Sequence, residues 1–138
     1  MRAIFCILLF IICTTSGCRK SRNQIPNTPI DLYIDTKLPS YISLNIVGGW
    51  IYASSGYKGL IIYRRSQDAF NAYERACPYD PTDDCSLVEV LKDNITAVDS
   101  CCGSQYLITD GNVIKGPATQ TLQQYQTTFD GTILHVFN

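Results

Sequence analysis

A succession of short apolar runs separated by turn residues is the feature that most constrains how this chain folds. From residue 31 onward, segments of four to eight residues rich in Ile, Val, Tyr and Leu alternate with Gly, Pro, Asn and Asp. No stretch shows a helical period with capping residues. Short strands at regular spacing predict an all-β fold. The predicted strands span residues 31–35, 41–47, 50–54, 59–65, 69–76, 86–91, 95–98, 105–109, 112–115, 122–129 and 132–137.

Two Asp-Gly pairs mark the clearest turns between these strands. Gly tolerates the positive φ that tight hairpin turns require, so Asp110-Gly111 and Asp130-Gly131 are predicted hairpin turns. The segment TQTLQQYQ (119–126) comes nearest to a helical pattern, and we favour a strand there.

The N-terminus has the pattern of an export signal. Arg2 precedes an unbroken apolar run at 3–13, which has the length of a secretory core and is short for a membrane span. The segment TTSGC, ending at Cys18, resembles a bacterial lipoprotein cleavage box, although Thr15 stands where such boxes usually carry an aliphatic residue. We therefore expect residues 1–17 to be a signal peptide and Cys18 to be lipidated. A plain signal peptide cut nearby, or a short anchor, is the alternative.

The rest of the chain is expected to form a lipidated N-terminus and linker, 18–29, followed by one domain, 30–138. Eleven basic and twelve acidic side chains give a balanced charge, which argues against a nucleic-acid partner. The one basic cluster directly follows Cys18 and suits a tether beside a membrane. We expect a protein of the bacterial cell envelope, bound to the membrane through its lipid and facing the periplasm, with an unknown envelope protein as partner.

The compartment determines what the cysteines are expected to do. Of seven cysteines, two leave with the signal peptide and Cys18 carries lipid. An even number in an oxidising compartment favours disulfides, and four cysteines allow three pairings. The pairing that joins the two adjacent cysteines needs a strained ring and is the poorest. The four cysteines of the domain are Cys77, Cys85, Cys101 and Cys102.

Two segments carry a family resemblance. The stretches ERACPYDPTDDC (74–85) and DSCCGSQYLITDGNVIKGPATQTLQQY (99–125) resemble the two cluster loops and following hairpin of a Rieske iron–sulfur domain. Such domains are all-β. Their second box is followed by Gly-Ser-x-aromatic, matched by residues 103–106, and then by Gly-Pro-Ala, matched by 116–118. The resemblance implies a Rieske-like fold of antiparallel sheets with two disulfide-bridged loops at its tip.

The cluster ligands of the family are mostly missing. A Rieske centre uses two cysteines and two histidines. On this alignment Cys77 stands in a cysteine place, but Tyr79 and Cys102 stand in the two histidine places and Asp99 in the second cysteine place. His135 is the only histidine in the chain, so a structural role is predicted for it and an ordinary Rieske cluster is excluded. We expect no cofactor and no metal.

The resemblance also assigns the disulfides. Many Rieske domains join their two cluster loops by a disulfide, and Cys85 and Cys101 match those places. This leaves Cys77 and Cys102 at former ligand places on facing loops, so a second bond between them is predicted. Closing the loop from 85 to 101 is expected to stabilise the fold by about 3 kcal/mol.

Two redox alternatives stay open. One is an electron-transfer protein with an atypical [2Fe–2S] site that uses Cys77 and Cys102 with two further ligands, such as Cys85, Cys101 or Asp99. The other is a thiol–disulfide exchanger in which Cys77–Cys102 cycles. Reactive thiols need nearby positive charge, whereas these are surrounded by carboxylates. Zinc on four cysteines is weaker still, because paired Cys-x-x-Cys knuckles are missing.

The favoured function is therefore structural or interactive. No catalytic residues are assigned and the chain is not expected to be an enzyme. A partner-binding tip would consist of 77–85, 99–104 and 116–118, centred on Tyr79 and Pro117. Most tyrosines, and Trp50, are interpreted as core or rim residues of strands.

Overall fold

The computed structural model describes residues 24–138, so the predicted signal peptide, 1–17, and Cys18 lie outside the described residues. The described chain is almost entirely β, as predicted, with one short 3-10 helix, η2 (Pro39–Asn45). The six-stranded sheet consists of β1 (Asp31–Asp35), β2 (Trp50–Ala53), β3 (Leu60–Arg64), β4 (Phe70–Glu74), β9 (Gln124–Phe129) and β10 (Ile133–Phe137). The four-stranded sheet consists of β5 (Val88–Val90), β6 (Thr96–Asp99), β7 (Gln105–Leu107) and β8 (Val113–Lys115).

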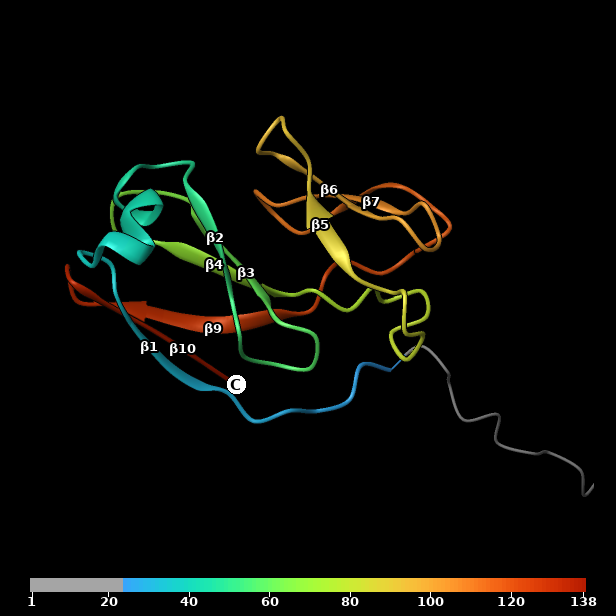
Figure 1. The fold of residues 1–138 in the computed structure, drawn as a ribbon, viewed down its shortest axis with the longest axis horizontal. Coiled ribbons are helices and arrows are strands. Elements are labelled where there is room, and N and C mark those ends of the chain that lie inside the picture. Colours follow the sequence, from blue (N-terminus) through green and yellow to red (C-terminus); the bar gives the residue numbers. More distant parts are fainter. Residues whose placement is uncertain (1–23) are drawn as a thin grey trace, which may run out of the picture.

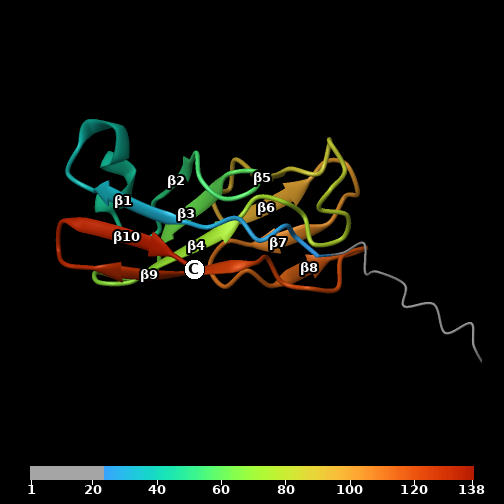
Figure 2. The same ribbon diagram turned by 90° about the horizontal axis from the view of Figure 1, so that it is seen from below.

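The smaller sheet is an insertion into the larger one. The larger sheet has the order β1-β10-β9-β4-β3-β2, with antiparallel neighbours, and the smaller is the meander β5-β6-β7-β8. The chain leaves the larger sheet after β4 and returns at β9, which pairs directly with β4. We call the larger sheet with η2 the base, and residues 75–123 the tip. They form two adjoining lobes (Figures 1 and 2).

Strand β4 links two hydrophobic cores. All five of its residues are buried. Ala72 belongs to the base core, which also holds Leu134 and Val136 of β10. Tyr73 faces the other way, into a second core under the tip. In β10 burial alternates along the strand, so one face covers the base core and the other stays partly exposed, as a period of two requires.

The predicted strand at 41–47 is wrong. Residues Pro39–Asn45 form η2 instead, with Pro39 in its first turn. Proline sets a helical φ and lacks the N–H that a sheet would need, so it favours a helical turn here. Of the residues of η2, only Leu44 is buried. The apolar residues that suggested a strand are thus largely exposed.

Both predicted turns are confirmed. Gly111 lies between β7 and β8 with φ 76°, and Gly131 lies between β9 and β10 with φ 100°. Gly111 is also required by close packing, because a Cβ there would lie 2.8 Å from the ring of Tyr73. The strand favoured in 119–126 exists only from Gln124 onward, as β9.

The segment before β1, residues 24–29, contains no helix or strand. Its Ile25 is nevertheless only 9% exposed, and the Asn138 amide donates to Asn27 Oδ1 (3.3 Å) and to the Thr28 carbonyl (3.1 Å). These contacts attach the segment to the C-terminus of the chain. Between residues 24 and 138 no helix has the length and apolar character needed to cross a membrane.

A buried carboxylate joins the base to the tip. Glu74, the last residue of β4, has no exposed surface. One of its oxygens accepts the backbone N–H groups of Lys58 (2.8 Å) and Ala76 (3.2 Å). The other accepts the N–H of Tyr57 (2.8 Å) and the hydroxyl of Tyr125 (2.9 Å). Glu74 therefore fixes the loop after β2, the first residues of the tip and β9 to one another.

Candidate functional site

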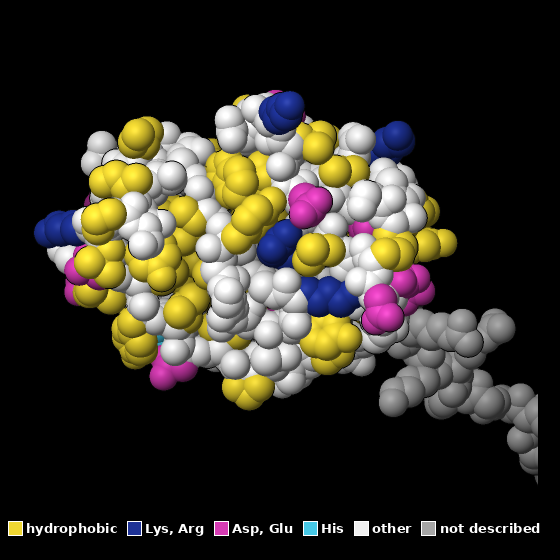
Figure 3. All heavy atoms as spheres, viewed as in Figure 1, with side chains coloured by type: hydrophobic (Ala, Val, Ile, Leu, Met, Phe, Trp, Pro, Cys, Tyr) yellow, Lys and Arg dark blue, Asp and Glu magenta, His cyan; other side chains and the backbone are white. Residues whose placement is uncertain are grey.

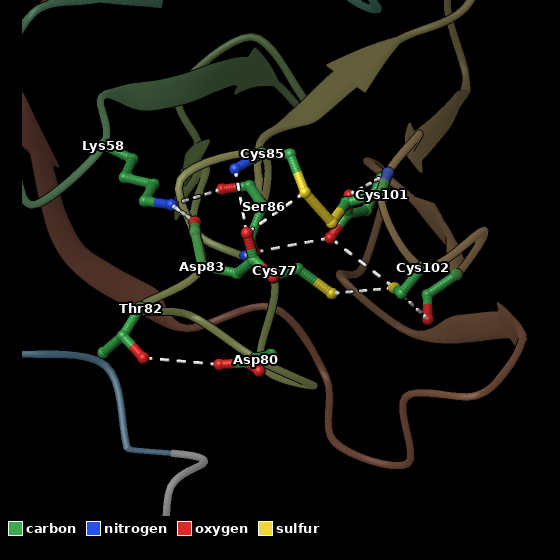
Figure 4. The surroundings of a disulfide bond; sticks show 11 residues. Lys58, Cys77, Asp80, Thr82, Asp83, Cys85, Ser86, Cys101 and Cys102 are labelled. Carbon is green, nitrogen blue, oxygen red and sulfur yellow. Dashed lines mark hydrogen bonds between the residues drawn. A yellow bond between two sulfur atoms is a disulfide. The ribbon is translucent and has the colours of Figure 1, made fainter.

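Two loops of the tip are joined covalently. The first tip loop, 75–87, and the second tip loop, 100–104, are linked by the Cys85–Cys101 disulfide, which confirms the predicted bond. Figure 4 shows this bond between the two loops, and both of its cysteines are exposed. Lys58 reaches over from the base, and its ammonium group donates to the carbonyls of Asp83 and Ser86 (2.9 Å for Ser86). The first loop is thus held on two sides.

The second predicted disulfide is not formed in this structure. Cys77 and Cys102 do meet across the two loops, but both are free thiols with their Sγ atoms 3.6 Å apart (Figure 4). A disulfide would require about 2.05 Å. Each sulfur instead has a hydroxyl partner, Tyr106 for Cys77 at 3.1 Å and Ser104 for Cys102 at 3.0 Å. The loops therefore bring the thiols into contact without joining them.

Burial determines the chemistry of Cys77. Its side chain is fully buried, and loss of water raises the pKa of the Cys77 thiol to about 12. Burial, together with the neighbouring Cys77, likewise raises the pKa of the Tyr106 hydroxyl. A neutral, inaccessible thiol is a poor nucleophile, because the thiolate is the reactive form. The geometry thus disfavours thiol–disulfide exchange at Cys77.

Asp99 brings a carboxylate to the same place. It is 1% exposed and ends β6, so it lies directly under the second tip loop. Its Oδ1 accepts the Cys101 N–H (2.8 Å), while its Oδ2 lies 3.4 Å from the Ser86 hydroxyl and 3.5 Å from Cys102 Sγ. No lysine, arginine or histidine among residues 24–138 forms an ion pair with it. Three potential metal ligands, Cys77, Asp99 and Cys102, have donor atoms within 4.8 Å of one another.

Ser104 and Tyr106, which sequence reasoning treated only as family markers, contact the two thiols. The Ser104 hydroxyl accepts the Ala118 N–H (2.9 Å) and contacts Cys102. It thereby attaches the Gly-Pro-Ala loop to the second tip loop. Ser86 was missed, because a lone serine inside a loop carries no recognisable signal. Its hydroxyl accepts the Cys77 N–H (3.2 Å) and points to Asp99.

The tip also carries the exposed residues predicted for binding. Tyr79 is 45% exposed, and Pro117 is exposed as well. The tip is not the main apolar surface, however. Larger exposed fractions occur on and after η2, where Ile42 is 59% and Ile46 69% exposed. Figure 3 shows apolar side chains gathered on this part of the base.

His135 lies in the base, away from the tip thiols. It sits on the outer face of β10, stacked between Tyr33 (4.1 Å between ring centroids) and Phe137 (4.6 Å). Its Nε2 lies 2.7 Å from Asp31 Oδ1. The sequence offered no partner for this histidine, because Asp31 is 104 residues away and becomes a neighbour only through β1–β10 pairing.

The residues that match the ligand places of the family do not fit a Rieske cluster. Such a cluster needs two imidazoles on one iron. Here Tyr79 and Cys102 stand at those places, and the one imidazole of the chain is in β10. The donor set present consists of two thiols and a carboxylate. This set matches neither iron of a Rieske centre.

Comparison with known proteins supports the fold alone. The chain is similar to the cyanobacterial plasma membrane Rieske protein PetC3 from Synechocystis PCC 6803, with a TM-score of 0.56 and 21% sequence identity. The similarity covers 78% of this chain and 99% of that chain. No protein-family model and no curated protein matches the sequence. The fold is therefore Rieske-like, as the sequence motifs implied.

Proposed function

We propose that this chain is a membrane-attached, Rieske-like domain of the bacterial cell envelope that has lost its iron–sulfur cluster and serves as a structural or interaction module. The observation that carries this proposal is the pair of replaced imidazoles, Tyr79 and Cys102. A domain that keeps the scaffold without the redox ligands retains shape, exposed surface and anchorage as its usable properties. Enzymatic activity is not part of this proposal.

The tip is the proposed contact surface. Tyr79 presents exposed apolar area on the first tip loop, which the disulfide and Lys58 hold in place. Pro117 is exposed on the Gly-Pro-Ala loop, which the Ser104–Ala118 hydrogen bond attaches to the second tip loop. Rigid aromatic area of this kind binds partners with little loss of conformational entropy. The partner is an envelope protein with a complementary apolar surface.

The position of the first described residue supports a tip that faces the membrane. The first described residue, Gln24, lines a groove together with Pro78 of the first tip loop. Five residues, 19–23, separate Cys18 from Gln24, so the six steps of the chain between them span at most about 22 Å. A lipid on Cys18 would therefore keep the tip close to the bilayer. The partner would be a membrane protein or one attached to the same surface.

The first test is the iron content of the full chain, produced under iron-replete conditions and again after reconstitution with iron and sulfide. We expect a colourless protein without stoichiometric iron, as measured by elemental analysis and a visible spectrum. Stoichiometric iron with sulfide-to-iron absorption bands would overturn the proposal and establish the atypical [2Fe–2S] alternative.

The second test concerns anchorage and contact. Cys18→Ala should move the protein from the membrane fraction to the soluble fraction, and continued membrane association would refute lipidation. A photo-crosslinking amino acid placed at position 79 should give a discrete adduct in intact cells. The matched control is position 33, an aromatic residue of the base that is 62% exposed. Adducts at 33 but not at 79 would refute the tip as contact surface.

A further inference from the structure

We propose that Cys77, Cys102 and Asp99 form a mononuclear site for a thiophilic divalent cation, with Zn²⁺ as the best-fitting ion. This site is distinct from an iron–sulfur cluster, because it holds one ion and uses no bridging sulfide. It does not depend on the lipid anchor or on a partner. The inference rests on the spacing of the three donor atoms, on the burial of Asp99 and on the hydroxyls around the sulfurs.

The distances agree with tetrahedral coordination of one ion. Zinc bonds of about 2.3 Å to sulfur and about 2.1 Å to oxygen place two sulfurs about 3.8 Å apart, and a sulfur and an oxygen about 3.6 Å apart. Cys77 and Cys102 Sγ are 3.6 Å apart, and Cys102 Sγ is 3.5 Å from Asp99 Oδ2. The third pair of atoms also lies within 4.8 Å. One ion can contact all three donors with little movement of the loops.

The uncompensated charge of Asp99 also points to a cation. Asp99 is 99% buried, and none of the described basic side chains pairs with it. A buried carboxylate without a counter-ion is costly, and neutral hydrogen-bond donors offset only part of that cost. A divalent cation would compensate Asp99 directly. It would replace the thiol protons of Cys77 and Cys102, which leave to solvent as the two metal–sulfur bonds form.

The surrounding hydroxyls are placed to support such ligands. The Ser104 oxygen already accepts the Ala118 N–H, so the serine proton is available to a thiolate at Cys102. The Tyr106 hydroxyl lies 3.1 Å from Cys77 Sγ and can donate its proton to a thiolate there. Groups of this kind orient metal ligands in known sites. Cys102 is only partly buried, so water can reach the ion and complete a fourth position.

The choice of ion follows from the donors. Two thiols and one carboxylate suit zinc, whereas magnesium and calcium prefer oxygen ligands throughout. The ligand spacing lacks the paired Cys-x-x-Cys knuckles of zinc ribbons, because the two cysteines come from different loops. The sequence offered these three residues only among the ligands of an atypical [2Fe–2S] alternative. The structure adds that their donor atoms lie within 4.8 Å of one another, as one ion requires.

The test uses the full chain, purified without chelating agents and incubated with Zn²⁺. We expect about one zinc per chain, with Cys77 and Cys102 protected from alkylation and Cys85–Cys101 still bonded, as read by elemental analysis and mass spectrometry. Co²⁺ in place of Zn²⁺ should give thiolate-to-cobalt absorption and the strong visible bands of tetrahedral cobalt. A Cys77–Cys102 disulfide in the chain as purified, or reduced thiols that take up no metal, would overturn the site.

Variants locate the ion. Cys102→Ser and Asp99→Asn should each lose stoichiometric metal. Asp83→Asn is the matched control: this carboxylate also lies beside two cysteines, Cys85 and Cys101, but their disulfide leaves no thiol to bind an ion, so metal binding should stay unchanged. Full metal content in Cys102→Ser would refute the site. If circular dichroism shows that Asp99→Asn does not fold, the cobalt spectrum of the unaltered chain decides, and missing thiolate absorption refutes the proposal.

Discussion

The base and the tip of this domain are stabilised in different ways. Strands of the base have four to six residues and enclose a core of aliphatic and aromatic side chains. Strands of the tip have only three or four residues, and long loops connect them to the base. The tip compensates with specific links, namely the Cys85–Cys101 bond, the Lys58 contacts and the Glu74 network. Both regions bury apolar side chains, but the tip adds these specific links to the core that it shares with β3 and β4.

This difference bears on function. Loops held by covalent and polar links can keep polar groups buried that a purely apolar core would exclude. The thiols, Asp99 and the Ser104 and Tyr106 hydroxyls are such groups. The base, by contrast, gives its one histidine a stacking partner on each side. We therefore expect metal binding at the tip, with the base as its scaffold.

The strongest test of this comparison removes the junction between the two regions. Glu74→Ala leaves three backbone N–H groups and the Tyr125 hydroxyl without their acceptor. Each buried donor without a partner costs about 1–3 kcal/mol, so we expect a loss of about 4 kcal/mol or more in the free energy of unfolding. Urea denaturation followed by fluorescence measures it.

The matched control for Glu74 is Tyr125→Phe, which removes one of the four donors and keeps the ring in the base core. It should cost about 1 kcal/mol. Equal effects of the two variants would show that the carboxylate does not hold the base and tip together.

The next largest effect concerns the covalent link of the tip. Replacing Cys85 and Cys101 by alanine opens a loop of sequence separation 16, which should lower the free energy of unfolding by about 3 kcal/mol. Hydrogen exchange should show faster exchange for amides of β5 and β6, while those of β9 and β10 stay protected up to global unfolding. Uniform loss of protection in both regions would contradict the proposed difference.

The same division explains how much could be predicted from the sequence. The strands of the base follow from period-two patterns such as ILHVF, because one face covers a core. The Cys85–Cys101 bond followed from family resemblance. The free state of Cys77 and Cys102, and the network of Glu74, could not be predicted. The first depends on how closely two loops approach, since the two Sγ atoms stay 3.6 Å apart where a bond needs about 2.05 Å. The second depends on donors that are far apart in sequence.

The single failure among the strands has a local cause. Residues 41–47 have the composition of a strand, but Pro39 directs the chain into η2. A pattern of apolar residues predicts burial only when the backbone can follow it. Here the helical turn that begins at Pro39 determined the backbone conformation more strongly than the apolar pattern did. Ile42 and Ile46 are exposed as a result.

A smaller effect is expected where the tip contacts the base by one hydrogen bond. Trp50 of β2 donates its indole N–H to Asn94 Oδ1 (3.1 Å), in the turn between β5 and β6. Asn94 has φ 60°, so Asn94→Gly removes the bond without straining the backbone. We expect a loss of about 0.5–1 kcal/mol. Asn94→Ala adds left-handed strain of about 1–2 kcal/mol, so thermal unfolding that ranks the two variants equally would refute this reading.

The smallest effect compares one turn of each region by pH. Hydrogen bonds from the Ile133 and Thr132 N–H groups lower the pKa of Asp130 in the base. The side chain and backbone of Thr96, with the Ile95 N–H, lower the pKa of Asp93 in the tip. A carboxyl whose pKa is lowered on folding stabilises above its unfolded pKa, about 3.9, and this contribution is lost as the pH falls through the folded value. Asn at either position keeps an acceptor but has no charge.

We therefore expect Asp130→Asn to be slightly less stable than the unaltered chain at neutral pH, with the difference shrinking as the pH falls below about 4. Urea midpoints across this range measure it. Asp93→Asn should show the same pH dependence in hydrogen exchange of β5 and β6 and little change in the urea midpoint, because opening of the tip precedes global unfolding. A difference for Asp130→Asn that stays constant with pH would show that its charge is not what stabilises the turn. Equal urea shifts for the two variants would show that base and tip unfold as one unit.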